Sequence, residues 1–151
     1  MPTVVIADTS SLIYLTALNQ LALLPRLYAS VYITPTVAAE YGLSLPEWMQ
    51  VRAPQDAVKT LIFGARIDIG EASAIALALE TPDSVLVLDD RRGRRAASRL
   101  QLNTTGTLGL LIAAKHNQLL PAIRPLVQQL LAHGMHLAPE VEAAAYRLAG
   151  E

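Results

Sequence analysis

Acidic side chains recur in this chain just past short apolar runs and at the predicted starts of helices. Each follows a predicted strand or lies in the first turns of a helix that follows a loop. In a parallel sheet these positions gather along one edge, where ligands of open α/β sheets bind. The candidate catalytic acids are Asp8, Glu40, Glu71, Asp89 and Asp90.

Each acid also has a local explanation when it is taken alone. Asp8 and the aspartate pair are types that cap helices, Glu40 suits a solvated helix face, and Asp68 with Glu71 has capping-box spacing. Folding alone does not explain their joint placement, because carboxylates about 4 Å apart repel by roughly 4 kcal/mol at an effective dielectric of 20. A cation or bound protons must offset that repulsion.

The cation that suits such a cluster is hard and prefers oxygen. Mg²⁺ or Mn²⁺ takes carboxylate and water ligands and can activate water to attack a phosphodiester bond, which is nuclease chemistry. Neighbouring hydroxyls either orient that water or a phosphate, or serve as local caps. These hydroxyls belong to Thr9, Ser10, Thr105 and Thr107.

One region of the chain concentrates positive charge next to the predicted acidic edge. Its arginines either hold RNA phosphates or form a solvated helix that pairs with neighbouring acids. Arginine in a first helical turn opposes the helix dipole, which favours a ligand or partner. The candidate RNA-binding residues are Arg91, Arg92, Arg94 and Arg95.

Strands and helices alternate along the chain, which predicts a mainly parallel sheet with helices on both faces. Strands are expected at residues 4–7, 31–34, 51–53, 84–88, 102–105 and 135–137. Helices are expected at residues 12–18, 21–28, 36–41, 56–63, 71–80, 91–100, 110–116, 121–133 and 139–148, with a turn at 106–109.

Composition narrows the remaining function classes. The 151 residues suit one domain, 1–151, and the absence of cysteine excludes disulfides, zinc-thiolate sites and thiol nucleophiles. No apolar run is long enough to cross a bilayer, so we expect a cytoplasmic protein that contacts no membrane. No phosphate-binding loop is present, and Ser10 stands where a haloacid-dehalogenase-like phosphatase needs its second aspartate. His133 and His136 flank a predicted helix end and are not expected to bind metal.

Five blocks of sequence, in order along nearly the whole chain, resemble the PIN-domain family and in particular short bacterial PIN proteins similar to VapC-type toxins. The blocks are Ala7–Ser10, Pro35–Glu40, Gly70–Ala78, Leu88–Ala96 and Thr105–Gly109. The resemblance implies a Rossmann-like sheet and a ribonuclease dependent on Mg²⁺ or Mn²⁺. It also implies a homodimer and a small antitoxin as partner.

Carried over by position, the resemblance makes Asp8 the first metal ligand, Glu40 a second acid and Glu71 a third. The pair Asp89 and Asp90 supplies the fourth. Many PIN nucleases carry this acid two residues beyond a strand-end hydroxyl, which selects Asp90, but here Asp89 follows the strand directly. Strand alternation predicts that one of the two faces the site, and both stay candidates as metal ligands.

Two functions remain open from the sequence. The first is a metal-dependent endoribonuclease that acts as the toxin of a toxin-antitoxin pair. The alternative is a catalytically silent PIN-like interaction module that binds RNA or a small antitoxin-like protein. The apolar positions of residues 119–131 and 141–148 favour the alternative, because they exceed what a core alone requires.

Overall fold

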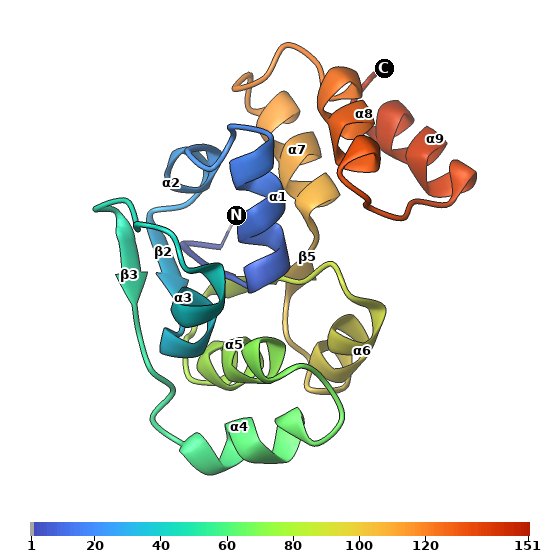
Figure 1. Ribbon diagram of the computed structural model, residues 1–151. Helices are drawn as coiled ribbons and strands as arrows, with labels where there is room; N and C mark the ends of the chain where they lie inside the picture. The colour runs from blue at the N-terminus through green and yellow to red at the C-terminus, as the bar shows by residue number, and fades with distance from the viewer. Residues whose placement is uncertain (1) are drawn as a thin grey trace.

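A computed structural model describes residues 2–151 and confirms the predicted parallel α/β fold (Figure 1). Its strands form one sheet in the order β3-β2-β1-β4-β5, and every neighbouring pair is parallel. The strands are β1 (Val4–Ala7), β2 (Ser30–Ile33), β3 (Met49–Val51), β4 (Ser84–Val87) and β5 (Thr104–Thr105). Parallel pairing brings the carboxyl ends of all five strands to one edge.

Helices connect the strands and cover the sheet on both faces (Figure 1). They are α1 (Thr9–Ala17), α2 (Leu23–Leu27), α3 (Pro35–Tyr41), α4 (Ala57–Gly64), α5 (Ile69–Leu79), α6 (Arg91–Arg99), α7 (Thr107–His116), α8 (Arg124–Ala132) and α9 (Pro139–Leu148). None of these helices, within residues 2–151, is long and apolar enough to span a membrane.

The central strand β1 is buried on both sides, as its uninterrupted apolar sequence predicts. Val5 and Ala7 pack into a core with α1, α2 and α7 on one face of the sheet. Ile6 points to the other face and packs with α5 and α6. Because β1 is central, the residue that follows it emerges in the middle of the carboxyl edge.

Helices begin immediately beyond this edge, which explains why cap-forming residues follow the strands. Asp8 caps α1 after β1, and Thr34 caps α3 after β2. Asp90 caps α6 after β4, and Gly106 occupies the N-cap position of α7 after β5. Gly42 ends α3 with φ 71°, as its predicted C-cap role requires.

Several predicted bounds shift by two or three residues, and three local predictions bear on the sheet and its edge. Residues 135–137 form no strand, because Met135 packs into the core of α7, α8 and α9 instead of pairing with the sheet. Residues 107–109 begin α7 and are not a turn, because Asp89 accepts the first free N–H of that helix from Thr107. Edge strand β3 lies two residues earlier than predicted, at Met49–Val51.

Helices α7, α8 and α9 form a second core beyond the sheet. This core absorbs most of the apolar residues of 119–131, which therefore do not form an open groove. Its buried members include Leu120, Ile123, Leu126, Val127 and Leu130. The most exposed apolar side chains lie on α4, where Val58, Leu61 and Ile62 are 61%, 69% and 62% exposed, and at the end of α9, where Leu148 is 63% exposed.

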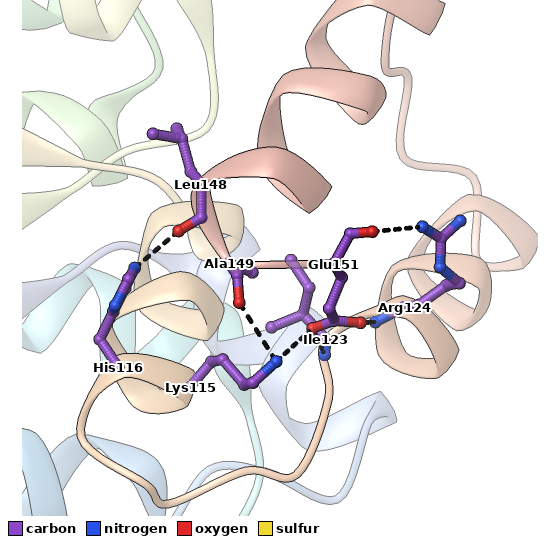
Figure 2. Close-up of polar contacts among 7 residues, drawn as sticks. All are labelled: Lys115, His116, Ile123, Arg124, Leu148, Ala149 and Glu151. Atoms are coloured by element: carbon purple, nitrogen blue, oxygen red, sulfur yellow. Dashed lines mark hydrogen bonds and ion pairs between the residues drawn. The ribbon is translucent and has the colours of Figure 1, made fainter.

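The side chain of Glu151 ties these helices together (Figure 2). Its carboxylate accepts hydrogen bonds from the backbone N–H groups of Ile123, at 2.7 Å, and Arg124, at 3.2 Å, where α8 begins. The ammonium group of Lys115, at the end of α7, donates to the same carboxylate at 3.1 Å. Lys115 also donates to the carbonyl of Ala149, which fixes the end of α9 against α7.

Candidate active site

Asp8 lies in the middle of the acidic edge and is almost completely buried, with 1% of its surface exposed. Its Oδ1 accepts a hydrogen bond from the backbone N–H of Ser11 at 3.0 Å, so it caps α1 as the local explanation predicts. Capping does not explain why the pKa of Asp8 is raised. Burial raises the pKa of Asp8 to about 6 against the opposing hydrogen bonds from Ser11, and the charge of Asp89 adds to the rise.

Glu71 lies in the first turn of α5 and does not act as a capping-box residue. Asp68 caps this helix by accepting from the N–H of Gly70 at 3.3 Å. The carboxylate of Glu71 does not reach back to complete the box, and its Oε2 is buried without a hydrogen-bond partner among residues 2–151. The structure therefore removes the local explanation for this residue and leaves an acid with an open oxygen atom.

Three other carboxylates act on Glu71. Burial raises its pKa to about 8, and the charges of Asp90, Asp8 and Asp68 add to the rise in that order. Asp68, which the sequence predicted only as a cap, thus belongs to the acidic edge. A carboxyl group with this pKa is mostly protonated at neutral pH, so a cation that binds there replaces a proton.

Asp89 and Asp90 occupy different places at this edge. Asp89 accepts two hydrogen bonds from Thr107, from its backbone N–H at 2.8 Å and from its hydroxyl at 2.6 Å. Asp90 caps α6 by accepting from the N–H of Arg92 at 3.1 Å, and it is exposed. Asp89 raises the pKa of Asp8, whereas Asp90 raises that of Glu71.

Strand alternation does not decide which aspartate is the ligand, because strand β4 ends at Val87, before either aspartate. Both residues act on acids of the edge, Asp89 on Asp8 and Asp90 on Glu71, and both stay candidate metal ligands.

Glu40 lies on α3 at the exposed border of the edge. Its Oε1 accepts a hydrogen bond from the Thr9 hydroxyl at 2.8 Å. A hydroxyl pair at 2.6 Å, between Thr34 and Ser73, joins the start of α3 to α5, and Ser73 also donates to the carbonyl of Gly70. The sequence analysis missed this buried pair, because Ser and Thr near helix starts carry no mark of a tertiary partner.

The structure gives the four candidate hydroxyls different surroundings. Those of Thr9 and Thr107 donate to Glu40 and Asp89, so they orient acids. The hydroxyl of Thr105 lies against Gly109, and Ser10 is exposed on α1. Thr9 and Thr107 therefore contact the site through carboxylates, and an orienting role for the four hydroxyls towards water or phosphate stays a prediction.

The four candidate arginines also differ in their contacts. The guanidinium of Arg94 donates from Nε to the carbonyl of Leu88 at 2.7 Å, and its Nη2 lies 3.9 Å from Oδ1 of Asp89. Arg91, Arg92 and Arg95 are exposed, and none forms an ion pair with another residue of 2–151. Pairing with neighbouring acids thus explains one of the four and leaves three available to a ligand.

Glycines border the acids at the starts of three helices, and the sequence analysis did not assign them this role. A Cβ on Gly93 would lie 2.9 Å from Oε2 of Glu71, and a Cβ on Gly70 would collide with Oε1 of Glu40. A Cβ on Gly106 would meet Asp89 and Arg94. Gly93 lies inside α6, where glycine lowers helix stability by about 1 kcal/mol relative to alanine. A glycine at such an unfavourable position was the sequence signal that could have pointed to this role.

The carboxylates fit a hard divalent cation by their chemistry, although their side chains do not converge on one point. No three carboxylate or imidazole groups of residues 2–151 lie together in a way that could hold a metal ion. The fit rests on the buried, unpartnered Oε2 of Glu71 and on the raised pKa values of Glu71 and Asp8. A divalent cation is the ligand that would relieve both features.

Comparisons with known proteins give one family match. A family model described as a PIN domain matches residues 4–151, nearly the whole chain. Searches of curated proteins and of solved structures find no match for this chain.

Proposed function

Because the chain belongs to the PIN-domain family, a family of nucleases, we propose that it is a metal-dependent endoribonuclease that hydrolyses RNA phosphodiester bonds. The observation that carries the proposal is the buried Oε2 of Glu71, which has no partner and lies among acids that raise its pKa to about 8. A fold gains nothing from such an atom, since an unpaired buried polar group destabilises it. A site that binds a cation does gain from this oxygen atom, because the atom is free to bind the ion.

Asp8, Glu71 and Asp90 are the residues that would hold Mg²⁺ or Mn²⁺, and Asp89 would complete the set from the side of Asp8. When bound, the ion would neutralise these carboxylates and supply the activation of water and the stabilisation of phosphate charge that phosphodiester hydrolysis needs. Hydrogen bonds from Ser11 and Thr107 keep Asp8 and Asp89 in place. Glu40, fixed by Thr9, lies at the border where a water or the substrate would enter.

Exposed arginines on α6 provide the attraction for RNA that the net charge of −1 does not. Arg91, Arg92 and Arg95 have no competing ion pair within residues 2–151, so their guanidinium groups can bind phosphate without losing a protein partner. Arg94 contributes less directly, because it already donates to the carbonyl of Leu88.

The same proposal extends to toxin-like biology with an antitoxin as partner, in the cytoplasm, and to a homodimer. Its support is the exposed apolar face of α4, formed by Val58, Leu61 and Ile62 at the i, i+3 and i+4 spacing of one helix face. Contiguous exposed apolar side chains of this kind mark surfaces that bind proteins.

A second candidate function is a silent interaction module that binds RNA or a small protein without cleavage. The observation that favours it is that the acids of residues 2–151 do not converge on one metal position. Metal binding separates the two functions, because a silent module has no need of the ion.

The test is cleavage of single-stranded and structured RNA with Mn²⁺ or Mg²⁺, with EDTA as control. Asp8→Asn is expected to lower the cleavage rate by about 100-fold or more, since it removes a charge at the centre of the site. Circular dichroism checks that the variant is folded, and Glu47→Gln, an exposed acid outside the site, is the matched control. Cleavage that is independent of metal and of Asp8 would contradict the proposal.

A further inference from the structure

A cavity of about 570 Å³ opens beside the acidic edge, between α6, β5, α7 and the chain that leads into α9. At the acidic end it is lined by Asp89, Arg91 and Arg94. The rest of its lining is largely aliphatic and includes Leu108, Ile112, Leu137, Val141 and Leu148. In Figure 1, α7 and α9 lie above α6, with β5 between α6 and α7.

We propose that this cavity is a nucleoside subsite that takes the base and ribose of the RNA nucleotide next to the bond that is cut. The inference rests on the proposed ribonuclease function and specifies how that site selects its substrate. Nothing in the acidic edge itself can distinguish one base from another, since carboxylates and a metal ion act on phosphate.

The charged residues of the cavity indicate where the phosphate of the nucleotide would bind. Arg91 is exposed and forms no ion pair within residues 2–151, so it is available to a phosphate at the mouth of the cavity. Asp89 lines the cavity and belongs to the acidic edge, so the cavity borders the edge at this residue. A nucleotide whose phosphate lies at Arg91 therefore extends its base away from the acids.

The remainder of the cavity suits the base and ribose. Its volume falls in the range of about 300–1,000 Å³ that is usual for small-ligand sites, and its lining is mostly apolar with a few polar groups. The polar groups include Thr104 and His136, which can hydrogen-bond to the edge of a base while aliphatic side chains cover its faces. The two arginines at one end favour a nucleotide over an apolar protein segment.

Tryptophan substitutions on and near α9 test this assignment. Ala144 lines the cavity, so Ala144→Trp fills it, whereas Ala143 is exposed and lies outside the lining, so Ala143→Trp is the matched control. Ala138→Trp places the same bulk at an exposed position of the lining, where folding is less affected. Each change is made in the Asp8→Asn background, and thermal melting checks folding.

The measurement is binding of short fluorescent single-stranded RNAs by anisotropy, at low salt. We expect Ala144→Trp and Ala138→Trp to weaken RNA binding by about 10-fold and Ala143→Trp to leave it unchanged. In the active background the same two variants should raise KM or alter the base preference at the cut, with a smaller change in kcat.

The outcomes separate this inference from the proposed function. Weaker RNA binding in the two cavity variants supports the subsite even when the wild type cuts none of the RNAs, a result that would remove only the nuclease. RNA affinity that is equal in all three variants, or absent in the parent, overturns the subsite even when RNA is cleaved. If the variants bind RNA with equal affinity, the cavity would instead be assigned to a segment of a protein partner.

Discussion

Two glutamates of this chain, Glu71 at the acidic edge and Glu151 beside α8, have opposite electrostatic surroundings. The carboxylate of Glu151 accepts from two backbone N–H groups and from the ammonium of Lys115. The hydrogen bond from Ile123 is the main reason that its pKa is lowered. Glu71 has a buried oxygen without a partner, three acidic neighbours and a pKa raised to about 8.

The carboxylate of Glu151 stabilises the fold, whereas the carboxylate of Glu71 is one that the fold only tolerates. A lowered pKa means that folding favours the charged form of Glu151, so the charge stabilises the folded protein at neutral pH. A raised pKa means that folding disfavours the charged form of Glu71, so the same charge destabilises it. Residues kept at a cost in stability mark functional sites, and each prediction below tests one side of this contrast.

The largest effect is expected from Glu71→Gln. The amide keeps the shape but removes the charge, so RNA cleavage should fall by about 100-fold or more. Stability at pH 8 should rise by roughly 1–3 kcal/mol, because the burial of a charge and its repulsion by Asp90, Asp8 and Asp68 are both removed. Cleavage kinetics with Mn²⁺ and urea unfolding at pH 8 measure the two quantities.

Glu47→Gln is the control for this variant, because Glu47 is exposed and is not among the acids that raise the pKa of Glu71. A variant that loses stability along with activity would show that Glu71 supports the fold, and the contrast with Glu151 would fail. A gain in stability with full activity would remove Glu71 from the site.

The second prediction concerns pH and metal. Glu71 and Asp8 have pKa values of about 8 and 6 in the folded protein, against 4.5 and 3.8 as ordinary values. The folded protein therefore holds protons that the unfolded chain has lost, and the stability from both groups is lost as pH rises through 6 and then 8. In EDTA, Tm should fall by several degrees between pH 5 and pH 8.5.

Mn²⁺ or Mg²⁺ should reverse this fall. A cation replaces the protons on the carboxylates, so it should raise Tm clearly at pH 8.5 and little at pH 5, where protons compete. In Glu71→Gln both the pH dependence and the metal effect should shrink. Tm that rises with pH in EDTA, or a metal effect of equal size at both pH values, would argue against a cation site.

The fold was predictable because the strands of the sheet carry apolar runs that end in cap-forming residues. Val4–Ala7 and Ser84–Val87 are buried strands, and the acids that follow both lie at the carboxyl edge as predicted. The PIN resemblance covers the same blocks and is confirmed by the family match over residues 4–151. The narrower likeness to VapC-type toxins stays a prediction.

Tertiary partners were not predictable from the sequence. Thr107 looks like part of a turn, yet its hydroxyl holds Asp89, and the pairing of Thr34 with Ser73 joins residues 39 positions apart. The spacing of Asp68 and Glu71 predicted a capping box, but the box does not close, because the carboxylate of Glu71 lies beside Gly93 instead. Local capping types carry no information on which neighbour the fold brings to them.

The smallest effect is expected from Glu151→Ala, on the other side of the contrast. The change removes the acceptor for the first N–H groups of α8 and the partner of Lys115, so stability at pH 7 should fall by about 1 kcal/mol, the usual cost of a lost helix cap. Cleavage should not change, because the polar contacts of Glu151 are with Lys115, Ile123 and Arg124, none of which belongs to the acidic edge (Figure 2). Urea unfolding and the cleavage assay measure the two effects, with Glu47→Ala as control.

The pH dependence of this variant gives the opposite sign from that of Glu71. The pKa of Glu151 is lowered, so its contribution is present above its ordinary value of 4.5 and is lost as pH falls through the lowered pKa. The wild type and Glu151→Ala should therefore differ in stability at pH 7 and converge in strong acid. A difference that persists in acid would mean that packing of the side chain, and not its charge, holds α7, α8 and α9 together.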